Sequence, residues 1–128
     1  MAKTILAVDD DENILNLEKA ILSQEGFDVI SATSAKEAFE AVQGSSIDLI
    51  LLDIVMPEMD GFELCRQLKA DPRVKDVPVV FLTARGGGEA LAEGFESGGV
   101  MYIRKPFTAA KLLAVVGTLL DTGSHRLQ

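Results

Sequence analysis

The chain has 128 residues, a length typical of one domain, and 48% of them are apolar, which is enough to form a proper core. A formal net charge of −8 argues against nucleic acid and against an anionic membrane as partners, because both attract an excess of Lys and Arg. No apolar run approaches the roughly 20 residues of a membrane span, the N-terminus does not read as a secretory signal, and the single cysteine, Cys65, excludes an internal disulfide, so we expect a cytoplasmic protein.

The spacing of apolar residues alternates between that of a strand and that of a helix along the chain. Short apolar runs predict strands at residues 3–8, 27–31, 47–53, 77–84 and 100–105. Helical spacing predicts helices at residues 12–26, 34–44, 60–70, 88–98 and 108–120. Five successive strand–helix units predict a single α/β domain, a doubly wound parallel sheet of five strands with five helices covering both faces. We expect this domain to span residues 1–121, with a flexible tail at 122–128 and no room for an attached output domain.

Capping residues mark the starts of several predicted helices. Ser34 with Glu37, and Asp60 with Glu63, have the spacing of capping boxes, and Thr108 is suited to cap the last helix. The helix at 88–98 is predicted to be weak and frayed, because glycines occur before it, within it and at its end.

Four of the five predicted strands end on polar residues that could form a site. These residues are Asp9 and Asp10 after the first strand, Asp53 on the third, Thr83 on the fourth and Lys105 on the fifth. In an open parallel sheet, ligands bind outside the carboxyl ends of the strands, at the point where the strand order reverses. We therefore expect these side chains to converge on one edge of the sheet.

Three converging carboxylates need a compensating positive charge. Two unit charges about 4 Å apart repel each other by about 4 kcal/mol at an effective dielectric constant of about 20. Lys105 is one candidate for the compensation and a bound cation is the other. With oxygen ligands alone, the site favours Mg²⁺, Mn²⁺ or Ca²⁺ over Zn²⁺ or Cu²⁺.

A site that combines acids, a lysine and a hydroxyl suits a phosphoryl group, because Mg²⁺ often completes its shell with phosphate oxygens. Asp53 lies alone on the central strand and is the expected nucleophile, since aspartate can form acyl phosphates. Mg²⁺ and Lys105 would neutralise the oxygens of the transferring group, and Thr83 would donate a hydrogen bond to one of them.

Four segments of the sequence, "AVDDDENIL", "LILLDIVMPEMDGFEL", "VPVVFLTAR" and "YIRKPF", resemble the receiver domain of two-component response regulators. The resemblance extends over about residues 3–120 and implies a sheet of order 2-1-3-4-5. It implies that Asp53 accepts a phosphoryl group from a sensor histidine kinase or a phosphotransfer protein. It also implies Mg²⁺ held by Asp9 or Asp10, by Asp53 and by the backbone carbonyl of Val55.

The resemblance further implies a switch. Thr83 and Lys105 would contact the phosphoryl group, a cis bond would precede Pro106, and Tyr102 would swing inward when Thr83 moves. The phosphorylated state would then be read by a downstream protein on the face formed by the fourth helix, fifth strand and fifth helix. On that face Val100, Met101 and Val115 suggest an apolar surface that meets a partner or a second copy, so we expect a monomer or a weak, phosphorylation-dependent dimer.

Two other functions remain open at this point. A pseudo-receiver would have the same fold and act only by docking, although the intact set of acids, Thr83 and Lys105 argue against it. An aspartyl-phosphate hydrolase of another α/β class would often carry a second acid two residues after the nucleophile, where this chain has Val55. We expect a phosphoacceptor that catalyses its own phosphorylation and dephosphorylation, not an enzyme acting on a separate substrate.

Overall fold

The computed structural model describes residues 2–54, 56, 60–84, 92, 94 and 96–120, with Thr83 described by its backbone alone. Its strands are β1 (Thr4–Val8), β2 (Asp28–Ala32), β3 (Leu49–Asp53), β4 (Val79–Thr83) and β5 (Met101–Arg104). Its helices are α1 (Glu12–Gln24), α2 (Ala35–Gly44), α3 (Gly61–Lys69) and α5 (Ala109–Leu120). The helix expected at 88–98 and the tail expected at 122–128 lie largely or wholly outside the described residues.

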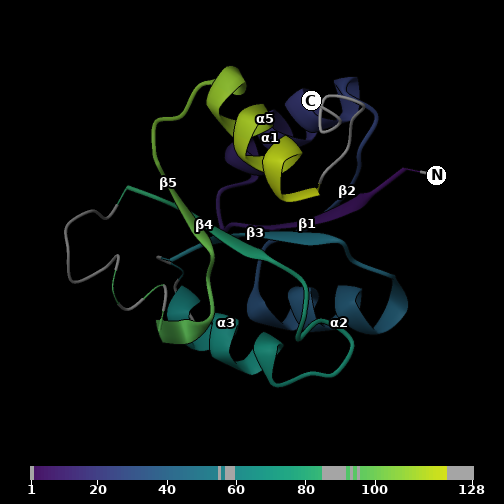
Figure 1. Ribbon diagram of the computed structural model, residues 1–128, viewed down its shortest axis with the longest axis vertical. Coiled ribbons are helices and arrows are strands. Elements are labelled where there is room, and N and C mark those ends of the chain that lie inside the picture. The colour runs from purple at the N-terminus through teal and green to yellow at the C-terminus, as the bar shows by residue number, and fades with distance from the viewer. Residues whose placement is uncertain are drawn as a thin grey trace.

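The strands form one parallel sheet of order β2-β1-β3-β4-β5, the order that the resemblance implied. Helices α1 and α5 cover one face of this sheet, and α2 and α3 cover the other (Figure 1). The chain runs from β1 outward to β2 and then returns past β1 to β3, so the strand order reverses between β1 and β3.

Both faces of the sheet are buried, which explains the unbroken apolar runs in the strand sequences. Successive side chains of a strand point to opposite faces. Leu52 of β3 packs into the core beneath α2 and α3, whereas its neighbour Leu51 packs beneath α1 and α5. All five residues of β3 are buried, and Asp53 is the last of them.

The predicted helix caps form, but neither predicted capping box closes as expected, since the Glu37 carboxylate accepts the backbone N–H of Thr33 and not that of Ser34. Side-chain oxygens each accept a backbone N–H from the first turn of their helix, at Asp11 for α1, Ser34 for α2, Asp60 for α3 and Thr108 for α5. The expected second capping box is not formed, because the Glu63 carboxylate accepts hydrogen bonds from Arg66 and Gln67 in the next turn.

Two glycines before β5 contribute to packing, which the sequence did not indicate. Gly98 has a φ of +115°, a conformation that residues with a side chain rarely adopt. A Cβ at Gly99 would lie 2.4 Å from the ring of Phe81, so this glycine lets β4 and the chain before β5 approach closely.

The expectation that Val115 contributes to an apolar outer face is wrong. Val115 is only 5% exposed and packs in the core beneath α1 and α5, because it lies on the side of α5 that faces the sheet. Val100 is 43% exposed and Met101 is half-buried, so the apolar surface near β5 is smaller than expected.

Candidate functional site

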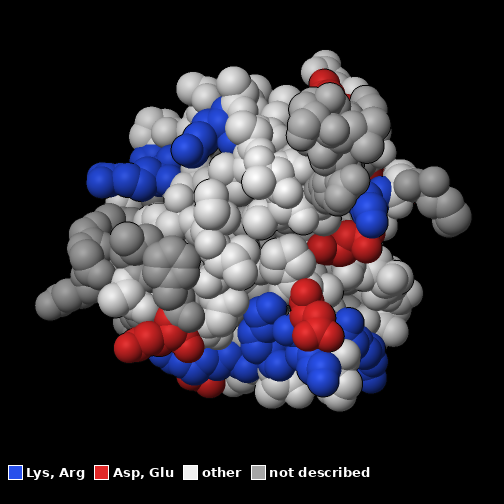
Figure 2. Space-filling model, in the orientation of Figure 1, with Lys and Arg blue, Asp and Glu red and all other residues white. Residues whose placement is uncertain are grey.

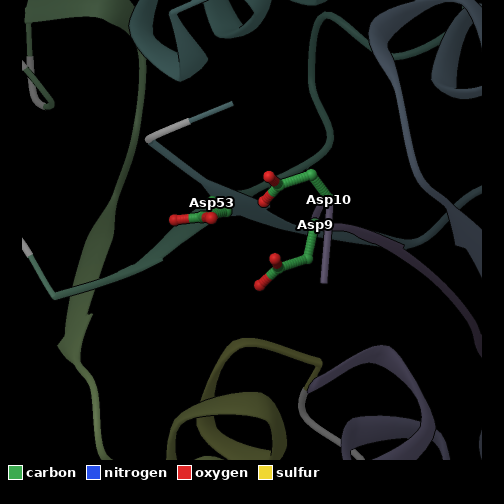
Figure 3. Close-up of side chains that lie close together, drawn as sticks. All are labelled: Asp9, Asp10 and Asp53. Atoms are coloured by element: carbon green, nitrogen blue, oxygen red, sulfur yellow. The ribbon is translucent and has the colours of Figure 1, made fainter. Parts of the chain in front are cut away.

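Asp9, Asp10 and Asp53 meet at the carboxyl ends of β1 and β3. The parallel register pairs Val8 with Leu52, so the residues that follow them come out of the sheet side by side. Each aspartate offers an oxygen that lies within 4.8 Å of the others. Figure 3 shows the three side chains reaching into the same space beyond the strand ends.

The three aspartates differ in how firmly the fold holds them. Asp9 is 1% exposed and Asp53 is 6% exposed, whereas Asp10 is exposed to solvent. The backbone N–H of Asp9 donates to the carbonyl of Ala32 at 3.1 Å, and its Oδ1 accepts the N–H of Asp11 at 2.9 Å. These bonds fix the Asp9 carboxylate at the start of α1 and leave Asp10 free to approach a ligand from the solvent side.

Lys105 reaches into this acidic group from the segment after β5. Its Nζ lies 2.6 Å from Asp9 Oδ2 and 3.6 Å from Asp53 Oδ2. Burial alone would lower the pKa of Lys105, but the hydrogen bond to Asp9 and the charge of Asp53 outweigh burial and raise that pKa above its usual value. The peptide bond between Lys105 and Pro106 is cis, as the resemblance implied.

Glu18 is a member of this group that the sequence reasoning missed. It lies on α1, is 2% exposed, and is coupled through its charge to Asp9, Lys105 and Asp53. Burial raises its pKa from 4.5 to about 8, and Asp9 contributes in the same direction. The available signal was its spacing of three from Leu15 and four from Leu22, which places an acid in the middle of the buried face of the helix.

The start of α3 is packed directly against the backbone that follows Asp53. The N–H of Gly61 donates to the carbonyl of Ile54 at 2.7 Å. A Cβ at position 61 would lie 2.3 Å from the carbonyl oxygen of Asp53 and 2.6 Å from the Cα of Ile54. Only glycine fits at this position, so the Asp60-Gly61 pair both begins α3 and closes the loop beside the candidate phosphoacceptor.

The other predicted site residues are described in part or not at all. Thr83 is the last residue of β4, the strand beside β3, so its backbone is at the same edge of the sheet as Asp53. Its side chain and the whole of Val55 lie outside the described residues. Tyr102 is half-buried and packs against the core on the side of α2 and α3, with its ring tilted against that of Phe81 at 6.5 Å between centroids.

The donors in this group fit a hard divalent cation. Three carboxylates with a formal charge of −1 each, less the +1 of Lys105, leave a net formal charge of −2. Oxygen ligands and a charge of this size match Mg²⁺. Fold and donors together define a doubly wound α/β domain with an acidic site where the strand order reverses, between β1 and β3.

Comparison with known proteins agrees with this description. The sequence matches the family described as the response regulator receiver domain over residues 5–117. The structure of the chemotaxis protein CheY4 of Vibrio cholerae has a TM-score of 0.91 and 30% identity, covering 94% of this chain and 100% of that chain. The receiver domain of NtrX from Brucella abortus has a TM-score of 0.84 and 32% identity, covering 93% and 99%. The chain belongs to the receiver domain family of two-component response regulators.

A curated relative shows where such a domain can occur. The transcriptional regulatory protein SrrA of Staphylococcus aureus is 38% identical over 120 residues, which are 94% of this chain and 48% of SrrA. The chain thus spans about half the length of the curated relatives it matches. In the part of the chain that the structure describes, no helix combines the length and apolar character needed to cross a membrane.

Proposed function

We propose that this receiver accepts a phosphoryl group on Asp53 from the phosphohistidine of a sensor histidine kinase or phosphotransfer protein, in a reaction that depends on Mg²⁺. The observation that carries the proposal is the placement of Asp53. It is buried at the end of the central strand, with Lys105 Nζ 3.6 Å away and carboxylate oxygens of Asp9 and Asp10 within 4.8 Å. A pseudo-receiver would have no need for this arrangement.

In the transfer, an oxygen of the Asp53 carboxylate forms a bond to phosphorus while the bond from phosphorus to the histidine nitrogen breaks. Asp9, Asp10, Asp53 and the Val55 carbonyl would hold Mg²⁺, which supplies positive charge to the phosphoryl oxygens during transfer. Lys105 is already within reach of Asp53 and would bind one of these oxygens. The Thr83 hydroxyl would donate a hydrogen bond to another. The same residues would assist the later attack of water, by which the protein dephosphorylates itself.

The phosphorylated state would be read by a protein that binds the face near β5 and α5, with Thr83 and Tyr102 as the switch. This face includes a groove of about 410 Å³, lined by Tyr102, Ile103, Arg104, Pro106, Phe107, Thr108 and Lys111. Figure 2 shows Lys and Arg side chains gathered beside β5 and the start of α5, although the chain as a whole is acidic. Arg104 and Lys111 are both exposed, which favours a partner segment that carries acidic groups.

Intact-mass measurement after incubation with acetyl phosphate and Mg²⁺ tests the phosphoacceptor. We expect one added phosphoryl group on the wild-type chain, and none on Asp53→Asn or in the presence of EDTA. Asp28→Asn is the matched control, because Asp28 is exposed at the start of β2, and this variant should gain the group as the wild type does. If the wild type takes no group from acetyl phosphate and also fails to bind beryllofluoride, the pseudo-receiver is the better description.

The oligomeric state is tested separately. Size-exclusion chromatography with light scattering, with and without beryllofluoride and Mg²⁺, should show a monomer that at most associates weakly when the mimic is bound. A stable dimer in both conditions would contradict this expectation. A monomer in both conditions would leave a different protein as the partner on the β5–α5 face.

A further inference from the structure

Phe81 is the residue of β4 that lies directly opposite Tyr102. β4 and β5 are neighbouring strands (Figure 1), and their register pairs Phe81 with Tyr102, whereas Thr83 pairs with Arg104. The centroids of the two aromatic rings are 6.5 Å apart. Both rings belong to the core between the sheet and helices α2 and α3, where Phe81 is buried and Tyr102 is half-buried. Phe81 therefore fills the interior space next to the Tyr102 ring.

Phe62 of α3 packs against the Phe81 ring and is itself held in place. The two centroids are 5.2 Å apart with 74° between the ring planes, an edge-to-face contact of the kind that aromatic rings favour. Phe62 is fully buried and follows Gly61, whose N–H donates to the carbonyl of Ile54 at 2.7 Å. The same glycine has no room for a Cβ against the backbone of Asp53. The contact of Phe81 with α3 is thus anchored beside the candidate phosphoacceptor.

Two glycines bring backbone against another edge of the Phe81 ring. A Cβ at Gly94 would lie 3.2 Å from both Cδ2 and Cε2 of Phe81, and a Cβ at Gly99 would lie 2.8 Å and 2.4 Å from the same atoms. The carbonyl of Gly94 accepts the N–H of Gly99 at 2.9 Å and the hydroxyl of Ser97 at 2.8 Å. The carbonyl of Ser97 in turn accepts the thiol of Cys65 on α3 at 3.3 Å. We call the segment that these two glycines close the glycine turn; its hydrogen bonds hold it against β4 and α3.

These contacts fix the position of the Phe81 ring. Protein interiors are close-packed, so the ring cannot move toward Phe62 or toward the glycine turn without displacing it. Tyr102 consequently cannot move deeper into the core on the side of Phe81 while both contacts are in place. A smaller side chain at position 81 would remove this obstacle.

We propose that Phe81 is a positioning residue of the switch, whose ring holds Tyr102 in its half-buried position until phosphorylation displaces the neighbours of that ring. This inference rests on the proposed function, because it takes Tyr102 as the aromatic residue that moves inward. Phe81 acts through Tyr102 and takes no part in the phosphoryl transfer itself. The inward movement then requires a shift of the glycine turn or of Phe62, in addition to the movement of Thr83.

Tyrosine fluorescence of the full chain tests the inference, because Tyr102 is the only tyrosine and the chain has no tryptophan. Quenching by acrylamide is measured without ligand and again with Mg²⁺ and beryllofluoride. We expect beryllofluoride to lower the quenching constant of the wild type, because Tyr102 moves inward. Phe81→Leu should show the low constant already without beryllofluoride, and most of the difference between the two conditions should be lost.

Val80→Ala is the matched control for a general loss of core packing. Val80 is the neighbouring buried residue of β4, and it packs on the opposite face of the sheet beneath α1 and α5. This variant should be less stable than the wild type, yet its quenching constants should match those of the wild type in both conditions. If Phe81→Leu does not fold, Phe81→Met takes its place with the same expectation, because methionine has a similar volume and adapts to irregular spaces.

Wild-type quenching constants for Phe81→Leu in both conditions would overturn the inference, and so would a Tyr102 that is more accessible than in the wild type. Intact mass after incubation with acetyl phosphate separates this result from the proposed function, since Phe81→Leu should still gain one phosphoryl group. A wild type that gains the group without any change in quenching would overturn the inference and leave Asp53 as the phosphoacceptor. A wild type that shows neither would overturn the inference and the proposed function together.

Discussion

The buried carboxyl of Glu18 should make the stability of the fold fall as pH rises. Its pKa is about 8 in the folded chain, against 4.5 as the ordinary value, so between these two values the folded state binds a proton more tightly than the unfolded state. For an acid whose pKa is raised by folding, stability is highest below the unfolded value and is lost as pH rises toward the folded value. Replacing Glu18 with glutamine removes this loss.

The size of the effect follows from the shift in pKa. Each pKa unit corresponds to about 1.4 kcal/mol. Relative to the glutamine variant, the wild type should lose about 3 kcal/mol of unfolding free energy between pH 4.5 and pH 7, and about 5 kcal/mol once Glu18 is fully ionised. The difference should therefore widen steadily through the neutral range.

Urea unfolding of both chains in EDTA, at several pH values from acid to mildly alkaline, measures this difference. EDTA is required because a bound cation would itself stabilise the folded state. A Glu40→Gln control on α2 should run parallel to the wild type, since Glu40 is exposed. A constant difference between wild type and Glu18→Gln at all pH values would refute the reasoning.

Four further substitutions test the charge of the site and the packing of the surrounding fold. Lys105→Met leaves the buried Asp9 carboxylate without its partner at 2.6 Å. Urea unfolding should therefore show that the free energy of unfolding falls by about 3 kcal/mol in EDTA and by less in Mg²⁺. Equal losses in the two conditions would contradict this. Gly99→Ala should lower the free energy of unfolding by about 1–3 kcal/mol through the clash with Phe81. Adding Phe81→Leu should recover part of this loss in a double-mutant cycle, whereas additive losses would contradict the contact. Gly61→Ala should cost about 2 kcal/mol and slow phosphorylation by acetyl phosphate, because the new Cβ displaces the backbone after Asp53; an unchanged rate would argue against that displacement.

The sheet and most of the site residues could be predicted because they depend on short stretches of sequence. Unbroken apolar runs identified the strands, and helical spacing with capping residues located the helices. Parallel strands then bring their carboxyl ends to one edge, which is enough to gather Asp9, Asp53 and Lys105. No knowledge of side-chain contacts was needed for that step.

What the sequence did not reveal depends on how the elements pack. Ile14, Leu15 and Leu17 gave α1 more apolar positions than one face can bury, so periodicity could not tell that Leu17 would be exposed and Glu18 buried. The same holds for Val115, whose place on α5 was decided by the rotation of the helix against the sheet. The sequence indicated only that Gly99 weakens the predicted helix before it. Its close contact with Phe81 could not be predicted, because Phe81 lies on a different element, β4.

The carboxylates of the site repel one another, so the core around them must supply the stability that this repulsion takes away. Asp9 and Asp53 share the ammonium of Lys105, and Asp10 lies beside them, so these four described side chains leave a net formal charge of −2 in the metal-free receiver. A cation that binds only the folded state adds RT ln(1 + [L]/Kd) to stability, about 2.7 kcal/mol at a concentration of about 100 Kd. A fully compensated site would be more stable without Mg²⁺ but would bind the ion and a phosphoryl group more weakly. The buried strand β3 and the buried residues 5–8 of β1 provide stability that offsets this net negative charge where the proposed reaction needs it.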